Sequence, residues 1–410
     1  MFPLLSLVLL VVGASAFAPG PLRFDDATIA KVKANMMNIS THSWELGAEA
    51  QALTELEVPS LSVFSNNRLP PPQSPSLSVR KTASDVFNIA TTIVRAMPPN
   101  STTLIDGDGA AGDPASLGVA VALTGWTLTD RSDQSFSNAA SAQLNHLLTA
   151  VPRNSNGAIS HREDQVQLWA DFVYMAPPFI AYEGALSTGD TKINLLQEAY
   201  NQCQEYREVL RDDSGLWQHI VLGTGGLDST HWGTGKYWHY KLLGQNLIVL
   251  SGNGWAAAGM LRVLETISHS DVASTFIEER RNLTRWVNEI VSSAWPHQAS
   301  FAGKNGTLFN VLDDPNTFAD SSSTAILAAS TYRLAVITNN HTLIPFADRA
   351  LQLIKNSIDQ DGWLLNTVDP LTFNTPSLPG AHSPEGQTFT ILLHTAREDY
   401  LTYISQLNNH

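Results

Sequence analysis

The chemically most informative stretch of the chain is residues 167–190, where the carboxylate Asp171 stands inside a largely apolar and aromatic run that is typical of a helix. Burying an ionised carboxylate is costly unless partners stabilise it or it keeps its proton. A carboxyl group that keeps its proton beside aromatic rings is suited to act as a general acid on a sugar. The alternative is a helix-start Asp that caps backbone N–H groups. Because Ser160 and Asp164 already offer caps upstream, we favour the catalytic role.

Helices are the elements that would position Asp171. Apolar residues recur at three- and four-residue spacing through much of the chain, whereas long alternating β-branched runs are nearly absent. The pattern therefore predicts an all-α fold. The expected helices span residues 41–56, 116–128, 143–151, 194–209, 255–267, 272–295, 323–336, 344–358 and 387–406.

Four short segments between these helices share one design, in which a polar residue and a turn glycine precede a short extended apolar piece. The glycines are Gly157, Gly215, Gly306 and Gly362, and they are separated by 58, 91 and 56 residues. This is near the length of two helices with their loops, so the chain holds about six helical hairpins. The repeat predicts one (α/α)6 barrel, with inner helices around a cleft that the loops line. An irregular all-α protein is the alternative.

The amino-terminal residues and the sequons predict a secreted, extracellular glycoprotein. Residues 1–16 form a short apolar run that ends in small residues, as in a secretory signal peptide, which leaves residues 17–410 as the barrel domain. The only cysteine is Cys203, so an intrachain disulfide is excluded and the fold depends on its core. The N-x-S/T sequons are at Asn38, Asn100, Asn282, Asn305 and Asn340.

The charge balance excludes two classes of partner. The chain has 24 Lys and Arg residues against 38 Asp and Glu residues, which gives a formal net charge of -14. Such a charge argues against nucleic acid and against an anionic membrane surface. It does not exclude an anionic sugar, because a local site can be polar or cationic within a negative field. The sequence leaves the oligomeric state open.

Four motifs together cover most of the expected barrel. They are Trp169-Ala170-Asp171-Phe172-Val173-Tyr174-Met175 with Pro178-Phe179, Gly215-Leu216-Trp217-Gln218-His219, Gly252-Asn253-Gly254-Trp255, and Ser383-Pro384-Glu385-Gly386-Gln387. In this order they resemble the six-hairpin glycosidases of families 105 and 88, the unsaturated rhamnogalacturonyl and glucuronyl hydrolases, in a secreted, fungal-type form. The first motif is specific by itself.

The resemblance implies a fold and a reaction. The fold is the (α/α)6 barrel, and the substrates are oligosaccharides, such as pectin or rhamnogalacturonan fragments, that a lyase has left with a 4,5-unsaturated uronic acid. An Asp at the position of Asp171 protonates C4 of the enol ether and helps to activate the water that adds at C5. The hemiketal then opens and releases the neighbouring sugar. Neither a metal nor an organic cofactor is implied.

The resemblance also implies a second carboxylate, for which the best match is Asp113. Two carboxylates that share a site push their pKa values apart, so that one remains protonated as the acid. Asp113 also fits a helix N-cap, with Pro114 at the first helical position. Both roles stay open, and Asp106 or Asp108 could supply the carboxylate instead.

Several residues could bind the sugar. His161 with Arg162, and His219, are suited to hold a uronate carboxylate and sugar hydroxyls, because Arg offers a fixed fork of donors and His a donor of adjustable charge. A loop His can equally be a solvated or capping residue. Glu385 is a lesser candidate. The aromatic residues expected to stack against sugar rings are Trp169, Tyr174, Trp217, Trp232 and Trp255, and core packing is the alternative for each of them. Asn253, in the loop before Trp255, is a further candidate for binding the sugar.

The resemblance is interrupted at residues 236–252. The family pattern is a continuous Trp-Gly-Arg-Gly-Asn-Gly-Trp, whereas here Trp232-Gly233-Thr234-Gly235 is followed by 17 further residues before Asn253-Gly254-Trp255. Removing those residues restores the pattern and shortens the 91-residue spacing to 74. The segment is apolar and aromatic and can be encoded with splice sites at both ends, which indicates a retained intron. A genuine substrate-binding loop is the alternative, and Thr234 in place of Arg leaves part of the substrate recognition open in either case.

Two other functions remain open at this stage. One is an ordinary glycosidase that uses Asp171 and Asp113 as an acid and base pair on a saturated sugar. The other is a carbohydrate-binding relative without catalytic activity. Distance separates these possibilities, because carboxylates that converge favour an enzyme, whereas an Asp113 that only caps a helix favours a binding protein.

Overall fold

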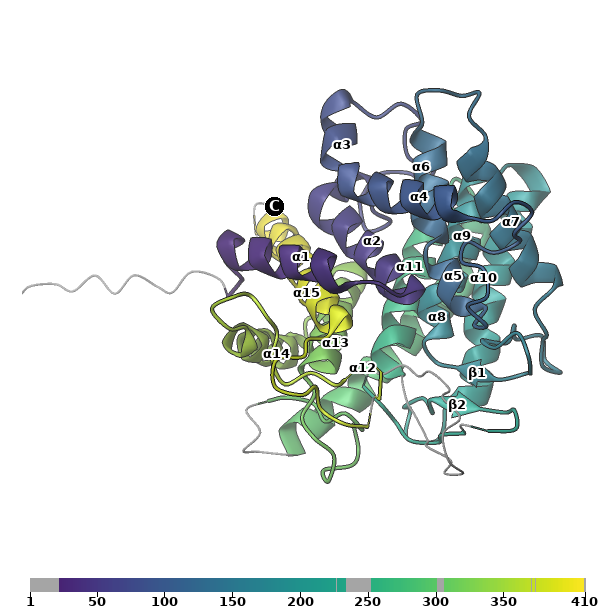
Figure 1. The fold of residues 1–410 in the computed structure, drawn as a ribbon. Coiled ribbons are helices and arrows are strands. Elements are labelled where there is room, and N and C mark those ends of the chain that lie inside the picture. The colour runs from purple at the N-terminus through teal and green to yellow at the C-terminus, as the bar shows by residue number, and fades with distance from the viewer. Residues whose placement is uncertain are drawn as a thin grey trace, which may run out of the picture.

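The computed structural model describes residues 22–225, 227–233, 252–300, 306–369, 371–372 and 374–408. Helices make up most of the described chain (Figure 1). The α-helices are α1 (Asp26–Ile39), α2 (Ser43–Glu57), α3 (Leu77–Thr82), α4 (Ser84–Ala96), α5 (Gly112–Ser116), α6 (Gly118–Thr127), α7 (Ser135–Thr149), α8 (Phe172–Met175), α9 (Pro177–Leu186), α10 (Gly189–Leu210), α11 (Asn253–His269), α12 (Ile277–Ser300), α13 (Ser321–Thr338), α14 (Ile344–Ser357) and α15 (Pro384–Leu407). The strands are β1 (Leu168–Trp169) and β2 (Ile220–Val221), and the 3-10 helices are η1 (Pro59–Leu61) and η2 (Ala273–Thr275).

Six of the helices form a closed inner ring. Neighbours in this ring pack in the order α2, α6, α9, α11, α13 and α15, and α15 returns to α2. Outside the ring, α1 packs on α15, α4 and α7 on α6, α10 on α9, α12 on α11, and α14 on α13. This arrangement confirms the all-α fold and the predicted (α/α)6 barrel.

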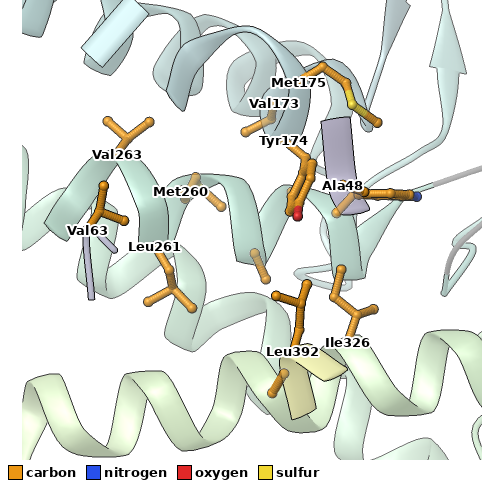
Figure 2. Packing of buried hydrophobic residues seen from close by; sticks show 14 of the residues in the cluster. Ala48, Val63, Val173, Tyr174, Met175, Met260, Leu261, Val263, Ile326 and Leu392 are labelled. Carbon is orange, nitrogen blue, oxygen red and sulfur yellow. The ribbon is translucent and has the colours of Figure 1, made fainter. Parts of the chain in front are cut away.

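Burial distinguishes the inner helices from the outer ones. On α13, 15 of 18 residues are buried, whereas on α1 only Ile29, Val32 and Met36 are. A helix that is covered on every side must carry apolar or small residues all round, and an outer helix needs only one narrow stripe. Side chains from several inner helices, including Met260, Ile326 and Leu392, fill the barrel (Figure 2). This packing stabilises the fold without a disulfide.

The predicted repeat is present in the loops that lead into the barrel. Gly157, Gly215 and Gly362 have φ angles of 106°, 85° and 87°, which favour glycine. Each donates its N–H to the carbonyl three residues earlier, at 3.3, 3.2 and 3.1 Å. Gly306 has a similar φ of 86°. The shared turn design therefore corresponds to a shared backbone geometry.

Each repeated loop is fastened to a helix by one further hydrogen bond. The residue two positions after the glycine donates its backbone N–H to a side-chain oxygen of a helix residue. Because a buried N–H needs a partner, this bond fixes the position of the loop relative to the helix. The pairs are Ile159 with Gln202, Trp217 with Asn253, Leu308 with Thr324, and Leu364 with Gln387.

Backbone contacts also join successive loops to one another. Ala110 bridges to Arg162, β1 pairs antiparallel with β2, and Trp232 bridges to Val311. Further along, Ser321 donates its N–H to the carbonyl of Asn366 at 2.9 Å. The loops therefore form a continuous belt on the rim where the inner helices begin, as the repeat predicts.

Some element boundaries differ from those predicted. Helix α7 begins at Ser135 rather than near residue 143, and α12 begins at Ile277 and runs to Ser300. Helices α1 and α4 were not predicted. Within the described chain, no helix combines the length and the apolar character that a membrane crossing requires.

Three of the predicted sequon residues, Asn38, Asn100 and Asn340, are exposed. Asn282 is half-buried on α12, and its side-chain amide donates to the Tyr200 hydroxyl at 2.8 Å, which makes it a poor acceptor site. The predicted signal peptide, Asn305 and residues 236–251 lie outside the described residues.

Candidate active site

Asp171 lies at the rim, between β1 and the short helix α8. The stretch is thus a strand followed by two short helices, rather than the single helix that its composition suggests. Asp171 occupies the N-cap position of α8, but its side chain makes no capping hydrogen bond. It is fully buried, and the preceding residue, Ala170, donates its N–H to the carbonyl of His219 at 3.0 Å. Asp171 is therefore placed by its backbone, and its carboxyl group is not used as a cap.

Asp113 lies within helix α5, one residue after its start, so the prediction that it is an N-cap is wrong. Its carboxyl Oδ1 lies 3.8 Å from His161 Nε2, and both side chains are buried. Gly112 permits this approach, because a Cβ there would lie 2.9 Å from His161 Nδ1. One oxygen from Asp113, one from Asp171 and one ring nitrogen from His161 lie within 4.8 Å of one another.

The imidazole of His161 forms a layer with two neighbouring rings. His161 stacks on Trp169 with 4.5 Å between centroids and 19° between planes, and Trp169 meets the ring of His219 edge-on at 5.6 Å. The indole N–H of Trp169 donates to Gln167 Oε1 at 2.8 Å, which holds the ring in place. The structure therefore brings five of the predicted site residues together, namely Asp113, His161, Trp169, Asp171 and His219.

A second aromatic pair borders Asp171. Phe172 stacks on Tyr206 with 4.8 Å between centroids, and the Tyr206 hydroxyl donates to the carbonyl of Ile159 at 2.6 Å. Burial, together with the charge of Asp171, raises the pKa of Tyr206 well above its ordinary value. Tyr206 thus stays neutral beside Asp171. Sequence reasoning missed it, because it belongs to the apolar face of α10, where an aromatic residue is usual.

Glu385 and Trp44 meet at the point where the ring of helices closes. The indole N–H of Trp44, on α2, donates to Glu385 Oε1 in the first turn of α15 at 2.7 Å. Burial, with the nearby charge of Glu45, raises the pKa of Glu385 to about 7. His42 stacks on Trp44 at 4.5 Å. Trp44 was not predicted, because its partner lies at the other end of the sequence.

Asp113, His161 and Asp171 could also supply ligands to a divalent cation. Each offers one atom, and within the described chain this is the only such group of three. Two carboxylates and an imidazole at this spacing are equally suited to proton transfer, because one carboxyl group holds a proton while the other remains charged.

Two predicted sugar-stacking residues lie instead in the barrel interior. Tyr174 is 1% exposed, and it lines a small cavity of about 20 Å³ together with Leu261 and Ile326. Its ring points into the packed core (Figure 2), and burial raises its pKa. Trp255 packs edge-on against Tyr174 at 4.6 Å and against Phe389 at 4.7 Å. The prediction that these two rings form walls for sugar is therefore wrong, because their side chains are used in core packing.

Three further candidates join the rim loops. The side chain of Asn253 accepts the N–H of Trp217 at 2.9 Å and donates to the carbonyls of Trp217 and Trp232 at 3.1 and 2.9 Å. Trp232 packs with Val311 and Val368 in a small separate cluster. These contacts join the rim loops to one another and to the start of α11.

Arg162 does not join the cluster either. Its guanidinium lies 3.3 Å from Asp164, and its side chain is about a quarter exposed.

A cavity of about 290 Å³ opens at the opposite end of the barrel, lined by Glu55, Glu265 and Arg333 among others, and the cluster does not line it. The cluster side chains are at most 3% exposed.

His231 links three rim loops. Its Nδ1 lies 2.7 Å from Asp313 and its Nε2 lies 2.8 Å from Asp212. Burial lowers the pKa of His231, but the hydrogen bonds and charges of the two carboxylates outweigh it, so the pKa is raised overall; His297 opposes this with a like charge. The pKa of Asp313 is lowered, chiefly by its hydrogen bond to His231.

This contact predicts a stability that depends on pH. Because the pKa of His231 is raised in the folded state, its ion pairs contribute fully to the free energy of unfolding below its ordinary pKa of 6.5. This contribution is lost as the pH rises through the folded-state pKa. Because both carboxylates are about a third exposed, the effect is screened to about 1 kcal/mol. We expect His231→Gln to lower the free energy of urea unfolding by that amount near pH 5.5, and by much less near pH 9. Equal losses at both pH values would contradict this, and His146→Gln is the control.

Comparison with known proteins identifies the family and agrees with the fold. The sequence profile of Glycosyl Hydrolase Family 88 matches residues 113–371, a span that contains Asp113, His161 and Asp171. A search of curated proteins gave no match. Solved structures with the same fold include a possible member of family GH105 from Klebsiella pneumoniae, with 17% identity, a TM-score of 0.68, and coverage of 97% of this chain and 100% of that one.

Two unsaturated glucuronyl hydrolases have the same fold. One is specific for heparin, with 11% identity, a TM-score of 0.61, and coverage of 92% of this chain and 96% of that one. The other, from Bacillus sp. GL1, is responsible for glycosaminoglycan degradation and has 12% identity, a TM-score of 0.58, and coverage of 91% and 95%. At these identities the likeness shows the six-hairpin fold alone.

Proposed function

The chain belongs to glycosyl hydrolase family 88, and from this premise we propose that it removes a 4,5-unsaturated uronic acid from oligosaccharides that a polysaccharide lyase has released, of the pectin or rhamnogalacturonan type. The observation that carries the proposal is the convergence of Asp113 and Asp171 on His161 within 4.8 Å. These carboxylates lie on different hairpins, and the fold buries both in one cluster.

The reaction follows from one proton donor and one water. Asp171, protonated, gives its proton to C4 of the enol ether, and water adds its oxygen to C5. The proton that the water loses returns to the carboxylate, so the pair ends the step as it began. The product is a hemiketal at C5, which opens and releases the neighbouring sugar. Asp113 keeps the proton on Asp171 by its like charge.

The position of the cluster favours an anionic substrate although the net charge of the chain is -14. The inner helices begin at this rim, and helix amino-termini carry partial positive charge and free N–H donors. His161 and His219 add donors of adjustable charge. A uronate carboxylate is therefore stabilised here more than a neutral sugar would be.

The spacing of the carboxylates disfavours an inverting glycosidase. Retaining enzymes hold their two carboxyl groups about 5–5.5 Å apart, and inverting enzymes about 6.5–9.5 Å apart. Here one oxygen of each carboxyl group lies within 4.8 Å of the other, with His161 beside both, which is shorter than the inverting spacing. A carbohydrate-binding role is disfavoured because Asp113 lies inside α5 rather than at its N-cap position and Asp171 makes no capping hydrogen bond.

The test is incubation with lyase-generated rhamnogalacturonan and glycosaminoglycan fragments while the ultraviolet absorbance of the C4=C5 bond is followed. We expect the absorbance to fall, and the two fragment classes show which uronate is preferred. Cleavage of saturated aryl glycosides with no fall in absorbance would establish the ordinary glycosidase instead. A chelator added in parallel shows whether the cluster uses a metal ion.

We also propose that the protein is secreted after cleavage behind residue 16, on the basis of the apolar leader and of exposed sequons such as Asn38, Asn100 and Asn340. Amino-terminal sequencing of protein from the culture medium, before and after removal of N-glycans, tests this proposal. Retention in the cell with the leader intact would refute it.

A further inference from the structure

Asp228 lies at one end of the layer formed by His161, Trp169 and His219. Its Oδ2 lies 3.4 Å from His219 Nδ1, and the two side chains are 3% and 0% exposed. Neither the sequence pattern nor the motifs of the resemblance single out Asp228. It stands in the loop that follows β2, and that loop turns back so that Asp228 and Ile220 exchange two backbone hydrogen bonds of 2.8 and 3.0 Å.

The two carboxylate oxygens of Asp228 make different contacts. Oδ1 accepts the backbone N–H and the hydroxyl of Thr230 at 3.0 and 2.8 Å, whereas Oδ2 has no hydrogen-bond partner within the described chain and faces His219. Asp130 makes the same turn with Ser132, at 2.9 and 2.6 Å, in an exposed loop. The turn therefore needs neither burial nor a histidine, and both are particular to Asp228.

A buried carboxylate is stable only when a positive group or several donors face it. The imidazole of His219 fills this role when it is protonated. A carboxylate beside Nδ1 keeps a proton on that nitrogen and favours the doubly protonated ring, in which Nε2, on the opposite side, is a charged donor. A charged donor is what a uronate carboxylate requires, because charge-assisted hydrogen bonds are the strong ones.

We propose that Asp228 is a positioning residue that holds His219 oriented and protonated, so that His219 binds the carboxylate of the unsaturated uronate. This inference rests on the proposed function and adds a specificity determinant to it. Other charged groups near His219 are Asp171, which follows the residue bonded to the His219 carbonyl, and His161 across Trp169. Asp228 differs from them in facing Nδ1 at ion-pair distance.

The first measurement is of kcat and KM for an unsaturated disaccharide across the pH range. Asp228→Asn keeps the size of the side chain and the bonds to Thr230 but removes the charge. We expect KM to rise roughly tenfold or more, with kcat changed by less than about threefold, because a charged hydrogen bond to substrate is weakened. The KM of the variant should also rise at a lower pH than in the wild type. Asp228→Glu should restore part of the affinity, and the matched control Asp130→Asn should change nothing.

The second measurement needs no turnover. Nuclear magnetic resonance of the His ring protons, with the His219 signal assigned from a His219→Gln variant, should show that His219 loses its proton at a lower pH in Asp228→Asn. An unchanged titration would overturn the proposal, as would a loss of kcat at constant KM. If the wild type leaves unsaturated substrates intact, the proposed function fails. The titration then still decides whether Asp228 holds the proton on His219.

Discussion

Replacing Asp171 with asparagine is expected to reduce the turnover of unsaturated oligosaccharides by roughly a hundredfold or more while the barrel stays folded. The amide has the shape of the carboxyl group but has no proton to give to C4. Asp171 is fully buried within 4.8 Å of an oxygen of Asp113, and in its protonated form it carries no charge, so the neutral amide leaves the charge of the cluster unchanged. We therefore expect the thermal midpoint of Asp171→Asn to stay level.

Two further variants show whether a loss of turnover is specific to Asp171. Asp164→Asn changes an exposed acid of the same loop, with a side chain that is 65% exposed, and should leave turnover and stability unchanged. Asp113→Asn removes the charge that is proposed to keep Asp171 protonated. As the pH is raised, this variant should therefore lose its activity at a lower pH than the wild type does. Steady-state kinetics with thermal unfolding of the three variants measure both effects. Wild-type turnover by Asp171→Asn would show that another group supplies the proton.

The fold was predictable to the extent that local pattern determines it. Helices with a broad apolar face, such as α13, and the turn glycines of the repeated loops are visible in the sequence because each is a local requirement. Helix α1 was missed because it buries only three residues, which leaves a weak periodic signal. Strand β1 was missed because two residues are too few to show alternation.

The site was predictable in its residue types but not in its contacts. Asp171, Asp113 and His161 are found from the motif and the resemblance, but only the packing of α5 against α8 shows that they meet. Residue type also cannot show on which side of a short helix a ring lies. Tyr174 follows Asp171 by one turn of α8 and points into the barrel, so an aromatic residue beside the proposed acid is part of the core. Asp228 has no sequence signal, because its neighbour His219 is set by the pairing of β1 with β2.

The described residues on each side of the predicted insertion already form a closed turn. The N–H of Asn253 donates to the carbonyl of Trp232 at 3.1 Å, and that of Gly254 donates to the carbonyl of Gly233 at 3.0 Å. If residues 236–252 are removed, these two bonds connect residues four positions apart, which is the pattern of one helical turn. Only Thr234 and Gly235 are then needed to join Gly233 to Asn253.

The junction also replaces one glycine by another. The carbonyl of Gly252 accepts the N–H of Ala256 at 3.0 Å at the start of α11, and in the shortened chain Gly235 takes that position. The side chain of Asn253 can then keep its three hydrogen bonds to Trp217 and Trp232. The shortened chain can thus keep these hydrogen bonds, which is the physical support for a retained intron.

We expect a variant that lacks residues 236–252 to be produced in higher yield, to unfold at the same or a higher temperature, and to show equal or greater turnover of unsaturated substrate, because a shorter loop costs less entropy to close. The matched control removes residues 237–253 instead. It has the same length but loses Asn253, so it should unfold at a markedly lower temperature. Reads that join the codons of Gly235 and Asn253 in the transcript would establish the splice directly. A shortened protein that folds but loses an activity of the full chain would show instead that the segment is a true substrate-binding loop.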